Sequence, residues 1–463
     1  MSFCRWTRQA VLLAAGGAAL AAGGAVAGGL TQPLYRFTGG ADGAFPSAGV
    51  TIGGDGTLYG TAIDGGSTDG VCAQNTPAGC GVVFMLTPPP SGAGGWSETV
   101  LYMFSGDVDG ALPEGGLIFG ADGALYGTAI NGGDLSCGFK GCGVVFKLVP
   151  NPDGSGWTEV VLHMFRGGRD GAGPFGGLAL GQDGAVYGAT INGGDSGGAC
   201  AASSGCGVVF KLTPPPPGGR RWTETVLRRF RDFGGGAFPE GGVILARRGD
   251  GVLGTTTSGG DLTCGSSGCG VVFKLLPPNA GQNEWTEIVL HTFSGADGAG
   301  PRSVVLSDDG TLYGTTENGG DGCRLGDACG VVFALTPPMA GQPFWAQSVL
   351  YSFTGGADGS SPLGGVTLGP DGVIYGTASE GGNRCDGGHR CGVVFALAPP
   401  SADATTWTQT VLHRFTGKQA GAFPNNVVLG ADGALYGTTT GGGGNPSICS
   451  RHIGCGMVFR LTP

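Results

Sequence analysis

The sequence is built from one segment that occurs seven times. Each copy holds an alternating stretch centred on the pattern Leu-Tyr-Gly-Thr, a glycine-rich loop with two cysteines, and a second apolar stretch. The central tyrosine recurs every 60 to 67 residues, with leucine in one copy, at Tyr59, Tyr126, Tyr187, Leu253, Tyr313, Tyr375 and Tyr436. A period this regular decides the architecture before any local motif does.

Each copy predicts four short β-strands. In the second copy, the apolar residues 116–120 are followed by an Asp-Gly hairpin turn at Asp122 and the alternating residues 124–130. After the cysteine loop come the apolar residues 143–149, a proline-rich connection and the alternating residues 157–165. Hydrophobic residues follow a period of two, and no stretch after the N-terminal segment shows a helical period.

A four-stranded sheet of this size cannot bury both of its faces, so neighbouring copies must cover them. The β-propeller solves this with four to eight such sheets, and we therefore expect an all-β, seven-bladed propeller. A solenoid is the alternative, but its coils are usually shorter and its ends need caps.

The two ends of the sequence are complementary. Residues 33–38 match the end of a fourth strand, and residues 456–461 form a third strand with no fourth strand after it. We expect the N-terminal strand to complete the last blade and to close the ring, which removes two exposed strand edges.

The first residues predict export. Arg5 and Arg8 flank the start of an apolar run, residues 10–22, and Ala25-Val26-Ala27 matches a signal cleavage site. We expect a signal peptide at residues 1–27, cleaved near Ala27, and one propeller domain at residues 28–463. No later segment is long and apolar enough to cross a membrane, so we expect a secreted or periplasmic monomer.

The cysteines support export. Fourteen of the 15 fall as one pair per repeat, which predicts disulfides of about 2 kcal/mol each. A zinc site is the weaker alternative, because the pairs lack CxxC spacing and no histidine recurs beside them. The expected pairs are Cys72–Cys80, Cys137–Cys142, Cys200–Cys206, Cys264–Cys269, Cys323–Cys329, Cys385–Cys391 and Cys449–Cys455.

The composition limits the partners. The formal net charge of −10 disfavours nucleic acid and anionic membrane surfaces. Glycine (102 residues) and proline (28 residues) recur in fixed positions between apolar stretches. They therefore mark turns rather than disorder.

The composite of LYGT, the glycine-rich loop, CGVVFKL and W…VLYxFSGADGAxP resembles the GloVer tandem-repeat family of exported bacterial proteins. The resemblance runs from about Leu34 to Pro463. It implies an extracellular repeat protein without an established activity, so it assigns no functional residue. Family members carry varied C-terminal anchoring segments, whereas this sequence stops directly after its last strand, which favours a freely secreted or periplasmic form.

A candidate ligand site lies where the copies differ. Strand order places the cysteine loops and the crossovers between copies on one face. The slot after the recurring crossover proline, at the start of the innermost strand, reads Ser47, Glu114, Phe175, Glu240, Arg302, Leu363 and Asn425. We expect a ligand at the channel mouth to contact Glu114, Glu240, Arg302, Asn425 and Ser47; the alternative is an exposed slot that varies freely.

Another recurring position, in the crossover between copies, carries an aspartate in five of the seven copies. The crossover aspartate is present as Asp42, Asp109, Asp170, Asp297 and Asp358 and replaced by Gly235 and Ala420. We expect a turn former rather than a calcium site, which needs several converging oxygens. We predict no metal and no cofactor.

The histidines do not indicate catalysis. His163, His291 and His413 share a slot on the outermost strand that tyrosine or Arg228 fills in other copies, which indicates a half-buried amphipathic role. His389 and His452 lie in cysteine loops without a repeated nucleophile or acid partner.

We therefore expect a non-enzymatic binding or scaffold propeller for a glycan or an extracellular protein. One alternative is a secreted hydrolase or lyase that uses rim carboxylates such as Glu114 and Glu240. The other is a purely structural envelope protein.

Overall fold

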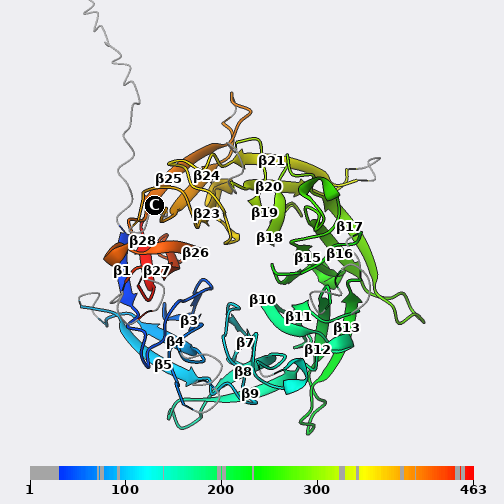
Figure 1. The fold of residues 1–463 in the computed structure, drawn as a ribbon, viewed down its shortest axis with the longest axis vertical. Coiled ribbons are helices and arrows are strands. Elements are labelled where there is room, and N and C mark those ends of the chain that lie inside the picture. The colour runs from blue at the N-terminus through cyan, green and yellow to red at the C-terminus, as the bar shows by residue number, and fades with distance from the viewer. Residues whose placement is uncertain are drawn as a thin grey trace, which may run out of the picture.

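The computed structural model describes residues 31–69, 72, 78–90, 94–138, 140–195, 200, 205–231, 234–322, 329–339, 344–385, 390–401, 403–443, 449 and 454–463. The predicted signal peptide, Cys323, His389 and His452 lie outside these residues. Within them, seven four-stranded antiparallel sheets surround a central axis (Figure 1). The predicted seven-bladed propeller is confirmed.

Six blades use four consecutive strands, numbered outward from the channel. Blade 1 holds β2 (Thr51–Ile52), β3 (Leu58–Ala62), β4 (Val82–Thr87) and β5 (Ser97–Met103). Blade 2 holds β6 (Ile118–Phe119), β7 (Leu125–Ala129), β8 (Val144–Pro150) and β9 (Trp157–Met164). Blade 3 holds β10 (Ala172–Leu180), β11 (Val186–Asn192), β12 (Val208–Thr213) and β13 (Thr223–Arg229).

The next three blades repeat this order. Blade 4 holds β14 (Val243–Leu245), β15 (Val252–Thr256), β16 (Val271–Leu276) and β17 (Thr286–Thr292). Blade 5 holds β18 (Ala299–Leu306), β19 (Leu312–Asn318), β20 (Val331–Thr336) and β21 (Ala346–Ser352). Blade 6 holds β22 (Val366–Leu368), β23 (Ile374–Ala378), β24 (Val393–Ala398) and β25 (Thr408–Arg414). Single 3₁₀ turns are η1 (Leu135–Cys137), η2 (Gly168–Asp170), η4 (Arg247–Gly249), η5 (Leu262–Cys264), η6 (Pro370–Gly372) and η8 (Lys418–Ala420).

Blade 7 joins the two ends of the sequence, as predicted. It holds β26 (Ala422–Leu429), β27 (Leu435–Gly441), β28 (Met457–Leu461) and, outermost, β1 (Thr31–Arg36). β1 runs antiparallel to β28, with Gln32 opposite Arg460. Phe37, fully buried after β1, contacts Phe84 of blade 1 and so seals the last interface.

Buried phenylalanines join each blade to the next. A phenylalanine that follows each outermost strand packs edge-to-face on one from the third strand of the next blade, with ring centroids 5.0 to 5.5 Å apart. The third-strand ring lies over the glycine of the Tyr-Gly-Thr pattern. A Cβ on Gly60 would lie 2.4 Å from Cζ of Phe84, so this close approach requires glycine.

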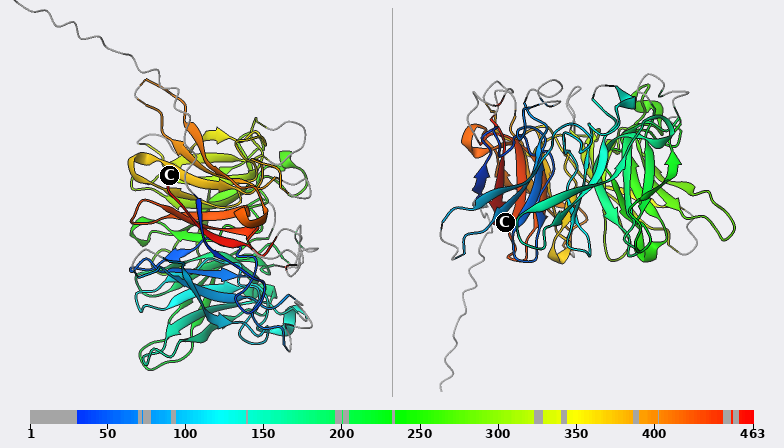
Figure 2. Two further views of the ribbon diagram at one scale, coloured as in Figure 1. Left: turned by 90° about the vertical axis from the view of Figure 1, so that its left-hand side faces the viewer. Right: turned by 90° about the horizontal axis from the view of Figure 1, so that it is seen from below.

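The strand order separates two faces. The cysteine loops and the crossovers between blades lie at one end of the strands, and the Asp-Gly hairpins and proline-rich connections lie at the other (Figure 2). Among the described residues, no helix has the length and hydrophobicity to span a bilayer.

The predicted disulfides form in six repeats, each between cysteines five to eight residues apart. Cys329 is also disulfide-bonded, and its predicted partner Cys323 lies outside the described residues. These short bridges stiffen the loops between the second and third strands.

Candidate ligand site at the channel mouth

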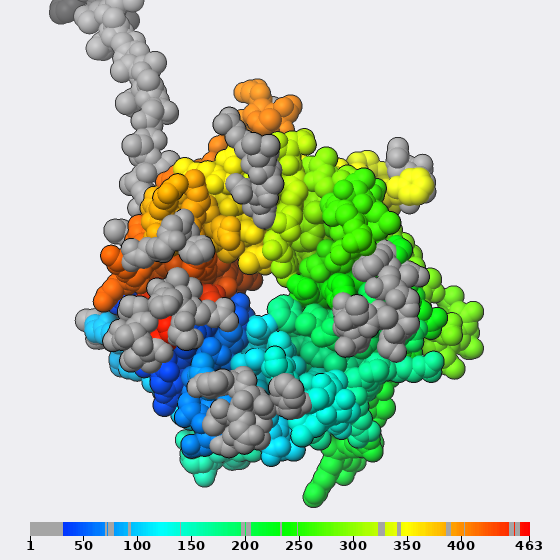
Figure 3. All heavy atoms as spheres, in the orientation of Figure 1, coloured from blue at the N-terminus to red at the C-terminus, as the bar shows by residue number. Residues whose placement is uncertain are grey.

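The central channel widens into a cavity of about 550 Å³, and the opening is visible at the centre of the ring (Figure 3). The slot after the proline faces the cavity. In blades 3, 5 and 7 it lies within the innermost strand, and in the other blades it lies in the crossover segment before that strand. All seven slot residues line the cavity: Ser47, Glu114, Phe175, Glu240, Arg302, Leu363 and Asn425. The sequence thus predicted their shared location, whereas ligand binding stays a prediction.

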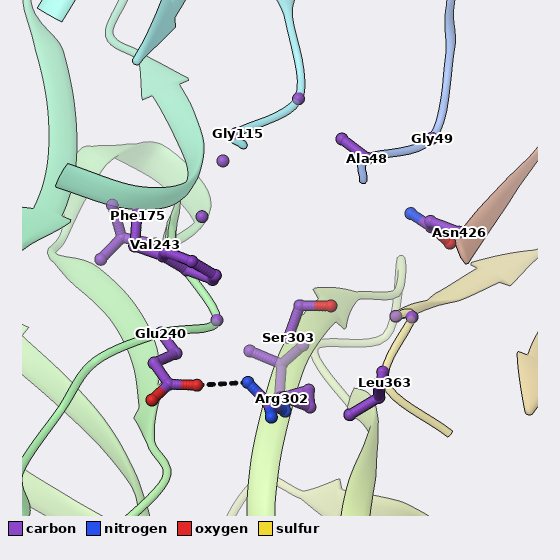
Figure 4. Close-up of a pocket in the computed structure, with 18 of the residues that line it drawn as sticks. Ala48, Gly49, Gly115, Phe175, Glu240, Val243, Arg302, Ser303, Leu363 and Asn426 are labelled. Atoms are coloured by element: carbon purple, nitrogen blue, oxygen red, sulfur yellow. Dashed lines mark hydrogen bonds and ion pairs between the residues drawn. The ribbon is translucent and has the colours of Figure 1, made fainter. Parts of the chain in front are cut away.

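Arg302 is the centre of the charged part of the rim (Figure 4). Its Nη1 donates to Oε2 of Glu240, and its Nη2 donates to Oε2 of Glu317. The three side chains are 20%, 28% and 30% exposed, respectively, so the ion pairs lie half-buried in the wall. Glu240 precedes β14 and Arg302 lies in β18, so the network joins blades 4 and 5.

Glu317, in β19, was missed in the sequence. The equivalent position of the other blades reads Ile63, Ile130, Ile191, Thr257, Ser379 and Thr440. A charge appears there once, in the blade whose rim slot carries arginine. The occurrence of both charged residues in one blade was the sequence signal that could have identified Glu317.

Across the ring, the polar side chains of blades 7 and 1 are engaged with the protein itself. Asn425 Nδ2 donates to the carbonyl oxygen of Pro46 at 2.6 Å and to Thr438 Oγ1 at 3.0 Å. Ser47 Oγ donates to the carbonyl oxygen of Glu114 at 3.3 Å. The predicted residues Asn425 and Ser47 therefore hold the rim together, whereas the neighbouring Asn426 lines the cavity with a buried Oδ1 that accepts no hydrogen bond.

The remaining wall is largely apolar, with Glu114 and Ser303 as polar side chains. Phe175 and Leu363 occupy the slot in blades 3 and 6, and Leu363 is 41% exposed. Leu178 and Val243 line the cavity near Phe175. The site therefore combines ion pairs with hydrophobic surface.

A set of threonine hydrogen bonds ties the inner segments of neighbouring blades together beside the rim. The threonine after the Tyr-Gly pair donates its hydroxyl to a backbone carbonyl of the next blade's inner segment. These bonds join Thr61 to Gly115, Thr255 to Arg302, Thr315 to Gly364, Thr377 to Asn425 and Thr438 to Ala48. The two interfaces of blade 3 differ: Thr128 Oγ1 has no hydrogen-bond partner, and Ala189 has no hydroxyl.

The described residues that line the cavity include no histidine and no cysteine. The hydroxyl of Ser47 is directed to a backbone carbonyl, and the guanidinium of Arg302 holds Glu240. Next to the cavity, Thr257 Oγ1 lies 3.5 Å from Oε1 of Glu240 and donates to the carbonyl oxygen of Phe238 at 3.2 Å. The arrangement offers donors, acceptors and an aromatic ring.

The recurring histidines and aspartates lie elsewhere, at the outer edge between adjacent blades. We call these positions the interface belt. At each interface it comprises three positions: the slot on one outermost strand that usually holds histidine or tyrosine, the crossover position that usually holds aspartate, and the position on the next outermost strand that usually holds glutamate or glutamine. Its members are Tyr35, Asp42 and Glu98; Tyr102, Asp109 and Glu159; His163, Asp170 and Glu224; Arg228, Gly235 and Glu287; His291, Asp297 and Gln347; Tyr351, Asp358 and Gln409; and His413, Ala420 and Thr31.

Belt aspartates bind both the slot residue and their own turn. Tyr35 Oη donates to Asp42 at 3.0 Å, and the backbone N–H of Thr38 donates to the same carboxylate at 2.8 Å. His291 Nε2 lies 2.8 Å from Asp297 Oδ2. These contacts agree with the expected turn-forming aspartate and half-buried histidine.

Three belt glutamates have raised pKa values. Burial, with a contribution from Asp42, raises the pKa of Glu98 to about 7, and burial with Asp109 raises the pKa of Glu159 to about 7. Burial and a hydrogen bond to Asp170 raise the pKa of Glu224 to about 9. Burial lowers the pKa of His413, which has alanine in place of the aspartate.

The fourth interface shows compensation between positions. Where Gly235 replaces the aspartate, Arg228 replaces the tyrosine, and its Nη2 lies 2.6 Å from Oε2 of Glu287. A Cβ on Gly235 would lie 3.0 Å from that glutamate oxygen. The glycine therefore makes room for the ion pair.

Among solved structures, the streptogramin B lyase structure matches with a TM-score of 0.50 at 14% identity, over 94% of this chain and 97% of that chain. The PQQ domain of pyranose dehydrogenase from Coprinopsis cinerea matches with a TM-score of 0.44 at 13% identity, over 94% and 96% of the two chains. A putative gluconolactonase matches with a TM-score of 0.40 at 12% identity, over 83% and 93%. At such identities, the first likeness supports the propeller fold alone, and the other two carry no argument.

In sequence, no curated protein matches the chain significantly. The model of the Gloeobacter/Verrucomicrobia repeat matches residues 24–266 and 197–450, which together span nearly all seven copies. The resemblance seen in the LYGT and CGVVFKL motifs is thereby confirmed, and the chain belongs to the Gloeobacter/Verrucomicrobia repeat family.

Proposed function

We propose that this protein is an exported, non-enzymatic binding propeller that takes a segment of a glycan at its channel mouth. The observation that carries this proposal is the Glu240–Arg302 ion pair beside the apolar wall of Phe175 in one cavity of about 550 Å³, with Arg302 also paired to Glu317. Pockets for small ligands typically measure about 300 to 1,000 Å³.

Sugar hydroxyls both donate and accept hydrogen bonds, and sugar rings carry an apolar face. The carboxylates of Glu240 and Glu317 accept hydrogen bonds, the guanidinium of Arg302 donates them, and Phe175 offers an aromatic surface. Because the Arg302 ion pairs and the threonine bonds already fix the rim, a ligand orders few side chains when it binds.

Export is supported by the disulfides. Six repeats close a cysteine pair within the described residues, and such bonds persist in oxidising compartments outside the cytoplasm.

The proposal is tested by glycan-array screening of the purified chain, followed by calorimetry on each glycan that binds. The matched variant is Arg302→Leu/Glu317→Ser, which imports the residues of blade 6, Leu363 and Ser379, into blade 5. We expect it to weaken binding at least about tenfold, the effect of losing one to two hydrogen bonds to charged groups. The control is Arg247→Ala, which removes an exposed ion pair to Asp308 on the opposite face.

Two outcomes contradict the proposal. If no glycan binds above background, or if the double variant binds as well as the parent chain, the channel mouth is not a glycan site. If a bound glycan is cleaved and Glu240→Gln abolishes the cleavage, the protein is a hydrolase or lyase instead.

A further inference from the structure

At one of the seven blade interfaces, all three belt residues are of types that bind metal ions. His163 in β9, Asp170 in η2 and Glu224 in β13 place one ligand-type atom each, and these atoms all lie within 4.8 Å of one another. Among the described residues, this is the group in which three such side chains converge so closely. We propose that His163, Asp170 and Glu224 bind a divalent transition-metal ion of the zinc class that links blade 2 to blade 3.

The geometry of Asp170 differs from that of its equivalents. In the four other copies with this aspartate, Oδ1 accepts a hydroxyl hydrogen bond of 2.5 to 2.9 Å, from Thr38, Ser105, Ser294 or Thr354. The corresponding residue here is Arg166, which has no hydroxyl and donates only its backbone N–H, to Oδ2 at 2.7 Å. Oδ1 therefore faces His163 without its usual donor, with Nε2 3.3 Å away.

The imidazole ring of His163 has a fixed orientation, but its Nε2 makes no hydrogen bond. The ring packs edge-to-face on Phe165 at 4.7 Å, which sets its orientation. Nε2 is buried without a hydrogen-bond partner, whereas the equivalent atom of His291 bonds its aspartate at 2.8 Å. All three belt histidines share the slot. Nε2 of His413, whose copy lacks the aspartate, also has no partner, so the difference between His163 and His291 follows from the surrounding residues.

Glu224 completes the set from the next blade, and its Oε1 is buried without a hydrogen-bond partner. This orphaned oxygen recurs at Glu98 and Glu159, so by itself it does not indicate a metal. At those two interfaces, however, the slot holds tyrosine. The combination of an imidazole, an Asp Oδ1 without a hydroxyl donor and a glutamate is what distinguishes the blade 2–3 interface.

Zinc suits this donor set. One imidazole and two carboxylates are usual ligands, at about 2.0 to 2.2 Å, with water in the fourth position. Ligand atoms around such an ion lie about 3.4 Å apart in a tetrahedron, so the side chains need to close by about 1 Å. Arg229, whose Nε donates to the carbonyl oxygen of Arg169, is the neighbouring positive charge and opposes binding.

The location gives the ion a structural role. At the blade 2–3 interface, Thr128 lacks the hydrogen bond that its equivalents make beneath the rim. A metal ion at the outer edge would link the same two blades through ligands from both.

The test measures binding of Zn²⁺ to the full, tag-free chain after treatment with chelator, with Co²⁺ as a spectroscopic probe. The variant His163→Tyr/Arg166→Ser imports the residues of the blade 1–2 interface, Tyr102 and Ser105. We expect one Zn²⁺ per parent chain and about 100-fold or more weaker binding in this variant, the upper end of the effect of removing a supporting residue from a metal site. Its unfolding temperature in chelator should match that of the parent.

The reciprocal variant, Tyr102→His/Ser105→Arg, places the same donor set beside Asp109 and Glu159. We expect its stoichiometry to rise to two. The proposal is overturned if the parent shows no saturable binding, as when Asp170 and Glu224 simply share a proton, or if the first variant binds Zn²⁺ as tightly as the parent. A stoichiometry that stays at one in the reciprocal variant overturns the assignment of these positions as the determinants.

Discussion

The channel mouth and the interface belt both vary among the seven blades, but they vary in different ways. At the belt, a change in one residue is matched by changes in its contacts: Arg228 faces Glu287 across Gly235. At the mouth, the slot passes from serine to glutamate, phenylalanine, arginine and leucine, and a matched change is evident for Arg302 with Glu317.

The contrast reflects solvent exposure and burial. Belt groups are half-buried between two blades, so an uncompensated change leaves a desolvated charge and costs stability. Mouth residues face an open cavity, where most changes cost little. Belt variation therefore maintains the ring, and mouth variation is available for recognition.

The largest expected effect on stability comes from deleting the N-terminal strand, which removes two belt residues and the strand that closes the ring. Deletion of residues 28–38 removes β1, the belt residues Thr31 and Tyr35, and the buried Phe37. We expect loss of cooperative unfolding, measured by circular dichroism and calorimetry, because β28 loses its partner strand. A truncated protein that melts like the parent would show that β1 does not close the ring.

A single belt substitution should have the next largest effect. Arg228→Ala removes the cation beside Glu287, whose side chain is 9% exposed. We expect the free energy of unfolding to fall by about 2 to 3 kcal/mol, below the usual cost of breaking a buried pair because Arg228 is itself 35% exposed. Chemical denaturation measures this change.

The double variant Arg228→Tyr/Gly235→Asp imports the tyrosine–aspartate set of three other interfaces and should recover most of that loss. Arg247→Ala, at an exposed pair, should cost less than about 1 kcal/mol. Equal losses from Arg228→Ala and Arg247→Ala would remove the distinction between belt and surface.

The pH dependence of stability should come partly from the belt. Glu98 and Glu159 have a folded-state pKa of about 7, against 4.5 for an unperturbed glutamate. Between these values the folded chain binds more protons than the unfolded chain, so the free energy of unfolding falls as pH rises from about 4.5 to about 7 and stays lower above that range.

The variant Glu98→Gln/Glu159→Gln, which imports Gln347 and Gln409, should flatten this fall. Urea midpoints between pH 5 and 8 measure it. Identical slopes for parent and variant would mean that these two carboxyls ionise normally.

The smallest effect on stability should come from the mouth. Arg302→Leu/Glu317→Ser should change the free energy of unfolding by less than about 1 kcal/mol, as for other partly exposed ion pairs, while it weakens ligand binding at least about tenfold. A loss as large as that of Arg228→Ala would place the Arg302 network among the elements that hold the ring together.

The fold could be predicted because every blade repeats the same short-range rules. Asp-Gly turns, alternation and the Tyr-Gly-Thr pattern fix four strands per copy, and the incomplete ends at residues 33–38 and 456–461 indicate ring closure. The slot after the proline could also be placed at the channel mouth, because strand order determines which ends of strands meet there.

Contacts between copies were harder to predict. His163 and Glu224 lie on different blades, and the pairing of outer strands across an interface has no local sequence signal. The replacements at Gly235 and Arg228 were visible in the sequence, but their connection required the three-dimensional neighbour, Glu287. Glu317 was missed for the same reason, since its partner Arg302 is defined by side-chain reach rather than by spacing.

The pairing of β1 with β28 also sets the order in which the molecule can assemble. Six sheets join strands that are close in sequence and can form early, whereas Tyr35 meets Val458 only when nearly the whole chain is available. Until then β28 presents an unpaired edge, the kind of surface that recruits other strands. We therefore expect the two ends to meet late in folding, and the edge of β28 to stay open to other strands until that contact forms.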